Sequence, residues 1–228
     1  MFPISDSIKA ARFPILNLII IGLNIWAFYL ELTVSDPEAF IAQFALIPAT
    51  VDFSNPVTLL PFVTSTFLHG GFMHIISNMW FLKVFGDNVE GHMNPFYFLL
   101  LYLGAGILGG LAQYLLNPTS TIPMLGASGA VAGVLGAYFV LFPHAHIKTF
   151  VPIIFVFTVI TVPAIFMLGY WFVLQIFSGI GTLGESVNQG GVAFWAHIIG
   201  FITGVLFGFA LKPKNEDQIR EGEILGYN

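Results

Sequence analysis

The sequence predicts an all-α membrane protein, a bundle of six transmembrane helices, and three observations support this fold class. Of the 228 residues, 57% are apolar and only 8% are charged, whereas soluble domains carry about 25% charged residues. Several apolar stretches reach the length of about 20 residues that a spanning helix needs. The seven Lys and Arg residues fall on one side of these stretches. We therefore expect one domain that contacts the lipid bilayer.

Six apolar segments are the expected spans. They cover residues 14–32, 70–86, 95–116, 125–142, 162–178 and 192–211. We expect a cytoplasmic N-terminus at 1–13, a membrane domain at 14–211 and a polar cytoplasmic tail at 212–228. The first apolar run has no small-residue cleavage site, so we expect a retained span rather than a signal peptide. Residues 147–161, interrupted by Pro152, are expected to lie along the inner interface or to pack as a loop.

Six crossings place both termini on the same side of the membrane, and the basic residues indicate which side. All seven lie in segments on that side: Lys9, Arg12, Lys83, Lys148, Lys212, Lys214 and Arg220. The connections on the opposite side contain acidic residues but no Lys or Arg. The positive-inside rule therefore predicts cytoplasmic termini, and we expect the plasma membrane as the location. The absence of Cys and of a basic cluster excludes thiol chemistry and argues against nucleic-acid binding.

The fourth segment opens with residues 126–133, GASGAVAG, which place the hydroxyl of Ser128 among small residues near the outer surface. Small neighbours leave a serine accessible, so Ser128 is a candidate nucleophile. A serine in a membrane helix more often bonds a carbonyl of its own helix or lies at a helix contact. This motif alone therefore leaves a structural role open.

The sixth segment places His197 beside small residues at every fourth position, namely Ala196, Gly200, Gly204 and Gly208. Such stripes allow close helix packing, so we expect Gly126, Gly133, Gly200 and Gly204 to support the contact between the fourth and sixth segments. His197 and Ser128 both lie a few residues inside outward-facing ends, where a neutral imidazole can accept the serine proton. Because no Asp or Glu is expected at the depth of His197, the prediction is a Ser–His dyad rather than a triad.

The second segment contributes His74 and Asn78, which are four residues apart and share one helix face. Acyl transfer needs such donors, because each one stabilises the oxyanion of the tetrahedral intermediate by roughly 3 to 4 kcal/mol. The backbone N–H groups of Ser128 and Gly129 are further candidates for this role. Hydrogen bonding between helices is the alternative role for His74 and Asn78.

Together these motifs resemble the rhomboid family of intramembrane serine proteases, over about residues 70–211. Residues 126–129 are similar to the family's GxSG motif, residues 196–200 to its catalytic histidine motif, and residues 69–78 to its second-helix motif. Residues 85–90, FGDNVE, match a further family pattern. The resemblance implies a six-helix fold with a mobile fifth helix and a cap loop, which cleaves transmembrane segments of other proteins.

Carried over by position, the resemblance implies Ser128 as nucleophile, His197 as base, and His74 and Asn78 as oxyanion donors. It also implies structural roles for His69 and Glu90 and no metal or cofactor. The glycine-rich residues 179–191 are the candidate cap.

The resemblance is to a prokaryotic type of rhomboid that lacks the first-loop Trp-Arg pair, and two departures from the family pattern stand out. Leu60-Pro61 stands where many members have a Trp-Arg pair. Ala132 stands where some bacterial members have a Tyr that stacks on the catalytic histidine. We expect another aromatic ring, Phe72 or Trp195, to support His197.

Three other functions compete with a serine protease. An inactive rhomboid-like scaffold would bind transmembrane segments without cleaving them, and would be expected to lack the serine or the histidine. A zinc protease using His69, His74 and His197 lacks the i, i+4 histidine pair and the accompanying Glu of a metal-binding helix. A small transporter lacks a mid-membrane carboxylate to couple ions. The oligomeric state is left open by the sequence.

Overall fold

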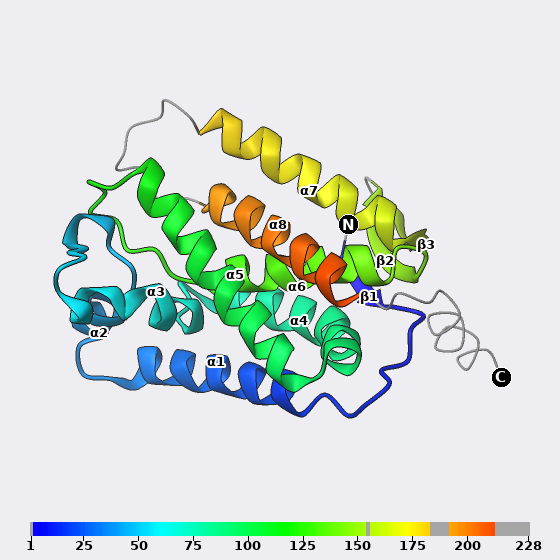
Figure 1. Cartoon of the computed structure of the whole chain (residues 1–228), viewed down its shortest axis with the longest axis horizontal. Coiled ribbons are helices and arrows are strands. Elements are labelled where there is room, and N and C mark those ends of the chain that lie inside the picture. Colours follow the sequence, from blue (N-terminus) through cyan, green and yellow to red (C-terminus); the bar gives the residue numbers. More distant parts are fainter. Residues whose placement is uncertain (1, 154–155, 183–191, 213–228) are drawn as a thin grey trace.

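The computed structural model describes residues 2–153, 156–182 and 192–212, and it is mostly helical (Figure 1). Helices occupy all six expected positions: α1 (Ile15–Thr33), α4 (Phe72–Met93), α5 (Pro95–Leu116), α6 (Ser128–Leu141), α7 (Ala164–Gly181) and α8 (Phe194–Leu211). Except at the C-terminal end of α4, which extends to Met93 rather than residue 86, the helix ends lie within three residues of the predicted ends. Most of the expected tail and cap, at 213–228 and 183–191, lies outside the described residues.

The helices have the length and hydropathy of an integral membrane protein. α1, α5, α7 and α8 are each long and apolar enough to cross a bilayer. α4 qualifies together with the segment Pro56–Phe67, from which it bends by 79°, and α6 is a shorter apolar helix of 14 residues. The exact number of six crossings therefore stays a prediction.

Short helices fill the connection between α1 and α4 at one end of the bundle (Figure 1). They are α2 (Pro37–Phe44), η1 (Pro48–Thr50), η2 (Pro56–Leu59), α3 (Pro61–Thr64) and η3 (Ser65–Phe67). Asp36 caps α2 by accepting the N–H of Ala39 at 3.0 Å. The Thr64 hydroxyl donates to the Phe44 carbonyl at 2.7 Å, which ties α3 to the end of α2.

The fold is a mostly helical bundle, as expected, with one small addition: a three-stranded antiparallel sheet lies at its other end (Figure 1). The strands β1 (Phe2–Ser5), β2 (His146–Ile153) and β3 (Val156–Pro163) pair in the order β1-β2-β3. Residues 147–153 and 156–161 therefore lie in two paired strands and not in a loop. These segments form strands because they are rich in β-branched and aromatic residues, whose side chains suit a pleated surface.

Polar contacts fasten the first residues and α1 to this sheet end of the bundle. The buried carboxylate of Glu90 accepts the N–H groups of Leu16 and Asn17, at 3.0 and 2.7 Å, at the start of α1. Asp6 accepts the Tyr138 hydroxyl at 2.5 Å and the Asn88 amide at 2.7 Å. The two Glu90 bonds satisfy N–H groups of the first turn of α1 that apolar surroundings would leave unpaired.

α6 is the central helix, and its packing determines where the site lies. Every residue of α6 is buried except Ser128 and Phe139, and the helix packs against α4, α5, α7 and α8. The outer faces of the surrounding helices expose large apolar side chains, as lipid contact requires. Ser128 is thus the first residue of a buried helix and remains partly accessible.

Candidate active site

Ser128 lies at the first position of α6, after a loop that is fixed at two places. Leu46 and Met124 exchange backbone hydrogen bonds at 3.0 and 2.8 Å, and the Gly126 N–H donates to the Ser65 carbonyl at 2.9 Å. Gly126 has a φ of 131°, which L side chains rarely adopt, so a glycine is required immediately before the turn into α6. The backbone thereby places the Ser128 hydroxyl in a fixed position.

α6 and α8 are in backbone contact along their glycines. A Cβ atom at Gly200 would overlap the Gly129 carbonyl oxygen, and one at Gly204 would overlap the Gly133 carbonyl oxygen. A Cβ at Gly133 would overlap the Ala105 methyl group of α5. Only residues without a side chain permit this approach. The contact brings the first turn of α8, which carries His197, beside the first turn of α6.

His197 is buried, with 8% of its surface exposed, and α7 supplies its main side-chain partners. Its Nδ1 lies 2.9 Å from Oε1 of Gln175. The ring of Trp171 lies 5.9 Å from the imidazole at an interplanar angle of 33°, and Phe194 contacts it edge-on at 6.4 Å.

The prediction that Phe72 or Trp195 supports the His197 ring is therefore wrong. Phe72 is 65% exposed and contacts Phe28 at 5.2 Å. Trp195 precedes His197 by two residues, which turns it about 200° around the helix and away from the imidazole. The ring that packs against His197, where Ala132 provides none, is that of Trp171 on α7.

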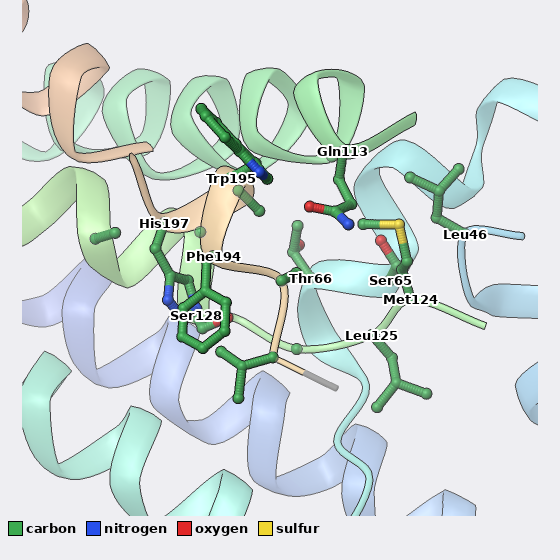
Figure 2. Close-up of a pocket in the computed structure, with 18 of the residues that line it drawn as sticks. Leu46, Ser65, Thr66, Gln113, Met124, Leu125, Ser128, Phe194, Trp195 and His197 are labelled. Atoms are coloured by element: carbon green, nitrogen blue, oxygen red, sulfur yellow. The ribbon is translucent and has the colours of Figure 1, made fainter. Parts of the chain in front are cut away.

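Ser128 and His197 line one cavity of about 1060 Å³. Figure 2 shows both side chains at one end of this cavity with Phe194, while Ser65, Gln113 and Met124 lie at the other end. Ser128 and His197, both within the described residues, make no hydrogen bond with each other. Hydrogen bonds between a nucleophile and its base are often long in substrate-free sites and shorten when substrate binds.

Four residues that can donate an N–H line the cavity that holds Ser128, namely His74, Asn78, Gly129 and Ser128 itself. The His74 ring lies so close to Gly126 that a Cβ there would be 2.6 Å from Cε1 and 2.7 Å from Nε2. Asn78 is buried, and its Nδ2 has no partner among the described residues. The N–H groups of Ser128 and Gly129, at the start of α6, likewise lack an acceptor within the described chain. A helix N-terminus with free N–H groups favours negative charge.

His69, next to this group of donors, is held by a carboxylate. Glu31 of α1 is buried and accepts the His69 N–H at 3.0 Å, and the His69 ring packs edge-on against His74 at 5.1 Å. A buried carboxylate therefore does lie at this end of the bundle, contrary to expectation. Its bonding partner is His69 rather than His197. In the part of the chain that the structure describes, no three His, Asp or Glu side chains are placed to hold a metal ion.

Comparison with known proteins agrees with this geometry. Residues 57–214 match the model of the rhomboid domain, which is well over half of the chain. This chain belongs to the rhomboid family. The matched region of the rhomboid domain includes α4 to α8 and every residue discussed above as a donor, nucleophile or base.

Several curated rhomboid proteins are similar to this chain. Rhomboid protein 1, mitochondrial, of Saccharomyces cerevisiae is 31% identical over 160 residues, which is 68% of this chain and 43% of the relative. A putative rhomboid protease of Bacillus subtilis is 36% identical over 76 residues, 33% of this chain and 38% of the relative. RHOMBOID-like protein 12, mitochondrial, of Arabidopsis thaliana is 33% identical over 163 residues, 60% of this chain and 45% of the relative. The chain thus matches less than half of each relative's length.

Two side chains at the site of this rhomboid domain were not anticipated from the sequence. Gln175 is the one side chain in residues 164–177 with an amide or charge, so it could have been singled out, because polar groups within spans mark functional sites by default. Trp171 lies one turn earlier on the same face. Neither belongs to a motif, and only the packing of α7 on α8 shows that both contact His197.

Proposed function

We propose that this rhomboid domain is an intramembrane serine endopeptidase that uses Ser128 and His197 as a catalytic dyad. The observation that carries the proposal is the shared cavity, in which an accessible serine, a buried histidine and unpartnered donors lie together. Each of these features has a structural explanation by itself. Their convergence from α4, α6 and α8 on one cavity matches what acyl transfer requires.

In the proposed reaction, Ser128 Oγ attacks the carbonyl carbon of the scissile peptide bond while Nε2 of His197 accepts the hydroxyl proton. The carbonyl oxygen becomes an oxyanion, which the donors of His74, Asn78 and the start of α6 stabilise. The C–N bond then breaks, and His197 gives its proton to the leaving amine. A water molecule, deprotonated by the same imidazole, hydrolyses the acyl-enzyme and restores Ser128.

The proposed substrates are transmembrane segments of other membrane proteins. Apolar side chains cover the outer faces of the helices, so a partner that reaches the cavity laterally through lipid would itself be an apolar helix that unwinds locally. We also propose that both termini face the side that carries the Lys and Arg residues and that the cavity opens to the opposite face. The sequence favours the plasma membrane as location, and cell fractionation tests it, since some relatives carry organelle names.

The test compares wild type, Ser128→Ala and His197→Ala in proteoliposomes with a model transmembrane substrate and a fluorophosphonate label. Ser77→Ala is the matched control, because Ser77 lines the same cavity but its hydroxyl donates to the His74 carbonyl at 2.9 Å. Cleavage and labelling are expected in wild type and Ser77→Ala and are lost in the other two variants. Unchanged cleavage by Ser128→Ala would refute the proposal.

The other functions predict other outcomes of the same test. Specific binding of the substrate segment without cleavage by wild type would indicate a scaffold. Loss of activity with a chelator would indicate a metalloprotease, since a serine enzyme should be unaffected.

A further inference from the structure

Gln175 is a polar side chain in the apolar helix α7, and both ends of its amide group are engaged. Its Nε2 donates to the carbonyl of Trp171, one turn earlier on the same helix, at 3.3 Å. Its Oε1 lies 2.9 Å from Nδ1 of His197. The bond to Trp171 fixes the orientation of the amide, because only the amide nitrogen can donate to a carbonyl.

The orientation of the amide determines the tautomer of His197. An amide oxygen accepts hydrogen bonds but cannot donate them, so Nδ1 must be the nitrogen that carries the proton. A neutral imidazole with a proton on Nδ1 has a free lone pair on Nε2. Nε2 is then the nitrogen available to accept a proton within the cavity that holds Ser128.

Packing reinforces the hydrogen bond. Trp171 packs against the imidazole as a tilted ring. Phe201, on the next turn of α8, packs against Trp171 at 6.0 Å and against Phe172 at 4.4 Å. Because Trp171 and Gln175 are four residues apart, they present the same face of α7 to His197. Two side chains of α7 therefore hold the imidazole: Gln175 through the bond to Nδ1 and Trp171 through ring packing.

We propose that Gln175 is a positioning residue for the base and takes the part that a carboxylate plays in a catalytic triad. This inference rests on the proposed serine protease function. When His197 accepts the proton of Ser128 on Nε2, the ring becomes an imidazolium, and the Nδ1–H bond to Gln175 becomes charge-assisted and stronger. The proton then passes from Nε2 to the leaving amine, so Gln175 itself neither gains nor loses a proton.

Three variants on α7 test the role. Gln175→Met keeps the length of the side chain but removes the acceptor, and Gln175→Glu restores an acceptor oxygen. Leu174→Met is the matched control, since Leu174 is the preceding residue and is 42% exposed. A hydrogen bond to a charged group contributes enough that kcat of Gln175→Met should fall about 10- to 100-fold. KM should stay unchanged, and Gln175→Glu should recover most of kcat.

Two results of the variants would overturn the proposal. One is a kcat of Gln175→Met equal to that of Leu174→Met. The other is a kcat of Gln175→Glu as low as that of Gln175→Met, which would indicate general damage to the packing of α7 rather than loss of an acceptor.

A measurement on the wild type decides the question even if a variant fails to fold. In ¹⁵N NMR of histidine-labelled protein, the His197 signals, assigned by their loss in His197→Ala, should show a protonated Nδ1 and an unprotonated Nε2. A protonated Nε2 in the neutral ring would overturn the proposal. This NMR measurement does not depend on cleavage. If the wild type showed no protease activity, the proposed function would be refuted, but the hydrogen bond between Gln175 and His197 would still have been tested.

Discussion

Replacing Gly200 by alanine tests whether backbone contact between α6 and α8 aligns the site. The new Cβ would overlap the Gly129 carbonyl oxygen and lie 3.0 Å from its carbonyl carbon, whereas carbon atoms pack best at about 3.5–4.0 Å. The two helices must therefore separate by about 1 Å beside Ser128. Such overpacking costs about 1–3 kcal/mol, and a misplacement of about 1 Å in an active site can reduce the rate about 100-fold.

The assay measures cleavage of a model transmembrane substrate and the melting temperature, with Gly104→Ala as the matched control. Gly104 is a glycine of α5 whose Cβ would meet nothing within 4 Å. We expect Gly104→Ala to behave as wild type. Gly200→Ala should lose about 100-fold in cleavage and melt several degrees lower, at about 2–4 °C per kcal/mol. Equal cleavage by the two variants would refute the argument that close backbone approach positions the dyad.

Three further changes test other parts of the structure. Gly126→Ala should abolish cleavage, because the new Cβ would lie 2.6 Å from the His74 ring. Gly71→Ala is the control: with a φ of 153° and no atom within 4 Å of the new Cβ, it adds backbone strain alone. Equal cleavage activities of the two variants would contradict the predicted clash. Glu90→Ala leaves the buried N–H of Asn17 and the half-buried N–H of Leu16 unpaired, and at about 1–3 kcal/mol each it should lower the melting temperature by about 5 °C or more. Burial raises the pKa of Asp6 to about 6 despite bonds from Tyr138 and Asn88, with Asp87 adding like charge, so the folded state binds this proton more tightly than the unfolded state. Stability should therefore fall by about 2–3 kcal/mol as the pH rises from 4 to above 6, a loss that Asp6→Asn should lack in pH-dependent thermal unfolding.

Helix positions could be predicted because length and hydropathy suffice to locate apolar helices. α5 begins and ends at the predicted residues. α4 continues past the predicted end at residue 86 and includes polar residues such as Asn88 and Glu90, which the hydropathy pattern does not count as part of a span. In the structure these side chains bond α1 and the N-terminal segment. When only one sequence is read, a polar residue inside a helix that bonds a distant segment is easily mistaken for the end of the helix.

The sheet could have been suspected from composition but not located. β2 and β3 are rich in Val, Ile, Thr and Phe, which favour strands. The same residues are apolar enough to suggest an interfacial segment. The pairing of Phe2 with Phe150 joins positions almost 150 residues apart, and such contacts leave no local signal.

At the candidate site, the residues proposed to carry the chemistry could be singled out from the sequence and do line one cavity, whereas the side chains that contact His197 could not be singled out. Ser128, His197, His74 and Asn78 stand in recognisable motifs, because the chemistry restricts both residue type and spacing. Gln175 and Trp171 act only through the position of α7, which no spacing within the sequence encodes. Glu31 was overlooked for the same reason, since its partner His69 follows 38 residues later.

The two members of the proposed dyad are held by different kinds of contact. Ser128 begins a buried helix that touches α8 through backbone atoms, so its position can change only if two helices separate. The His197 ring is oriented by side chains of α7, a helix at the edge of the bundle with few buried residues (Figure 1). A shift of α7 would thus release the base while leaving the nucleophile in place. Changes in α7 packing should consequently alter kcat before they alter stability, whereas changes in the α6–α8 glycines should alter both together.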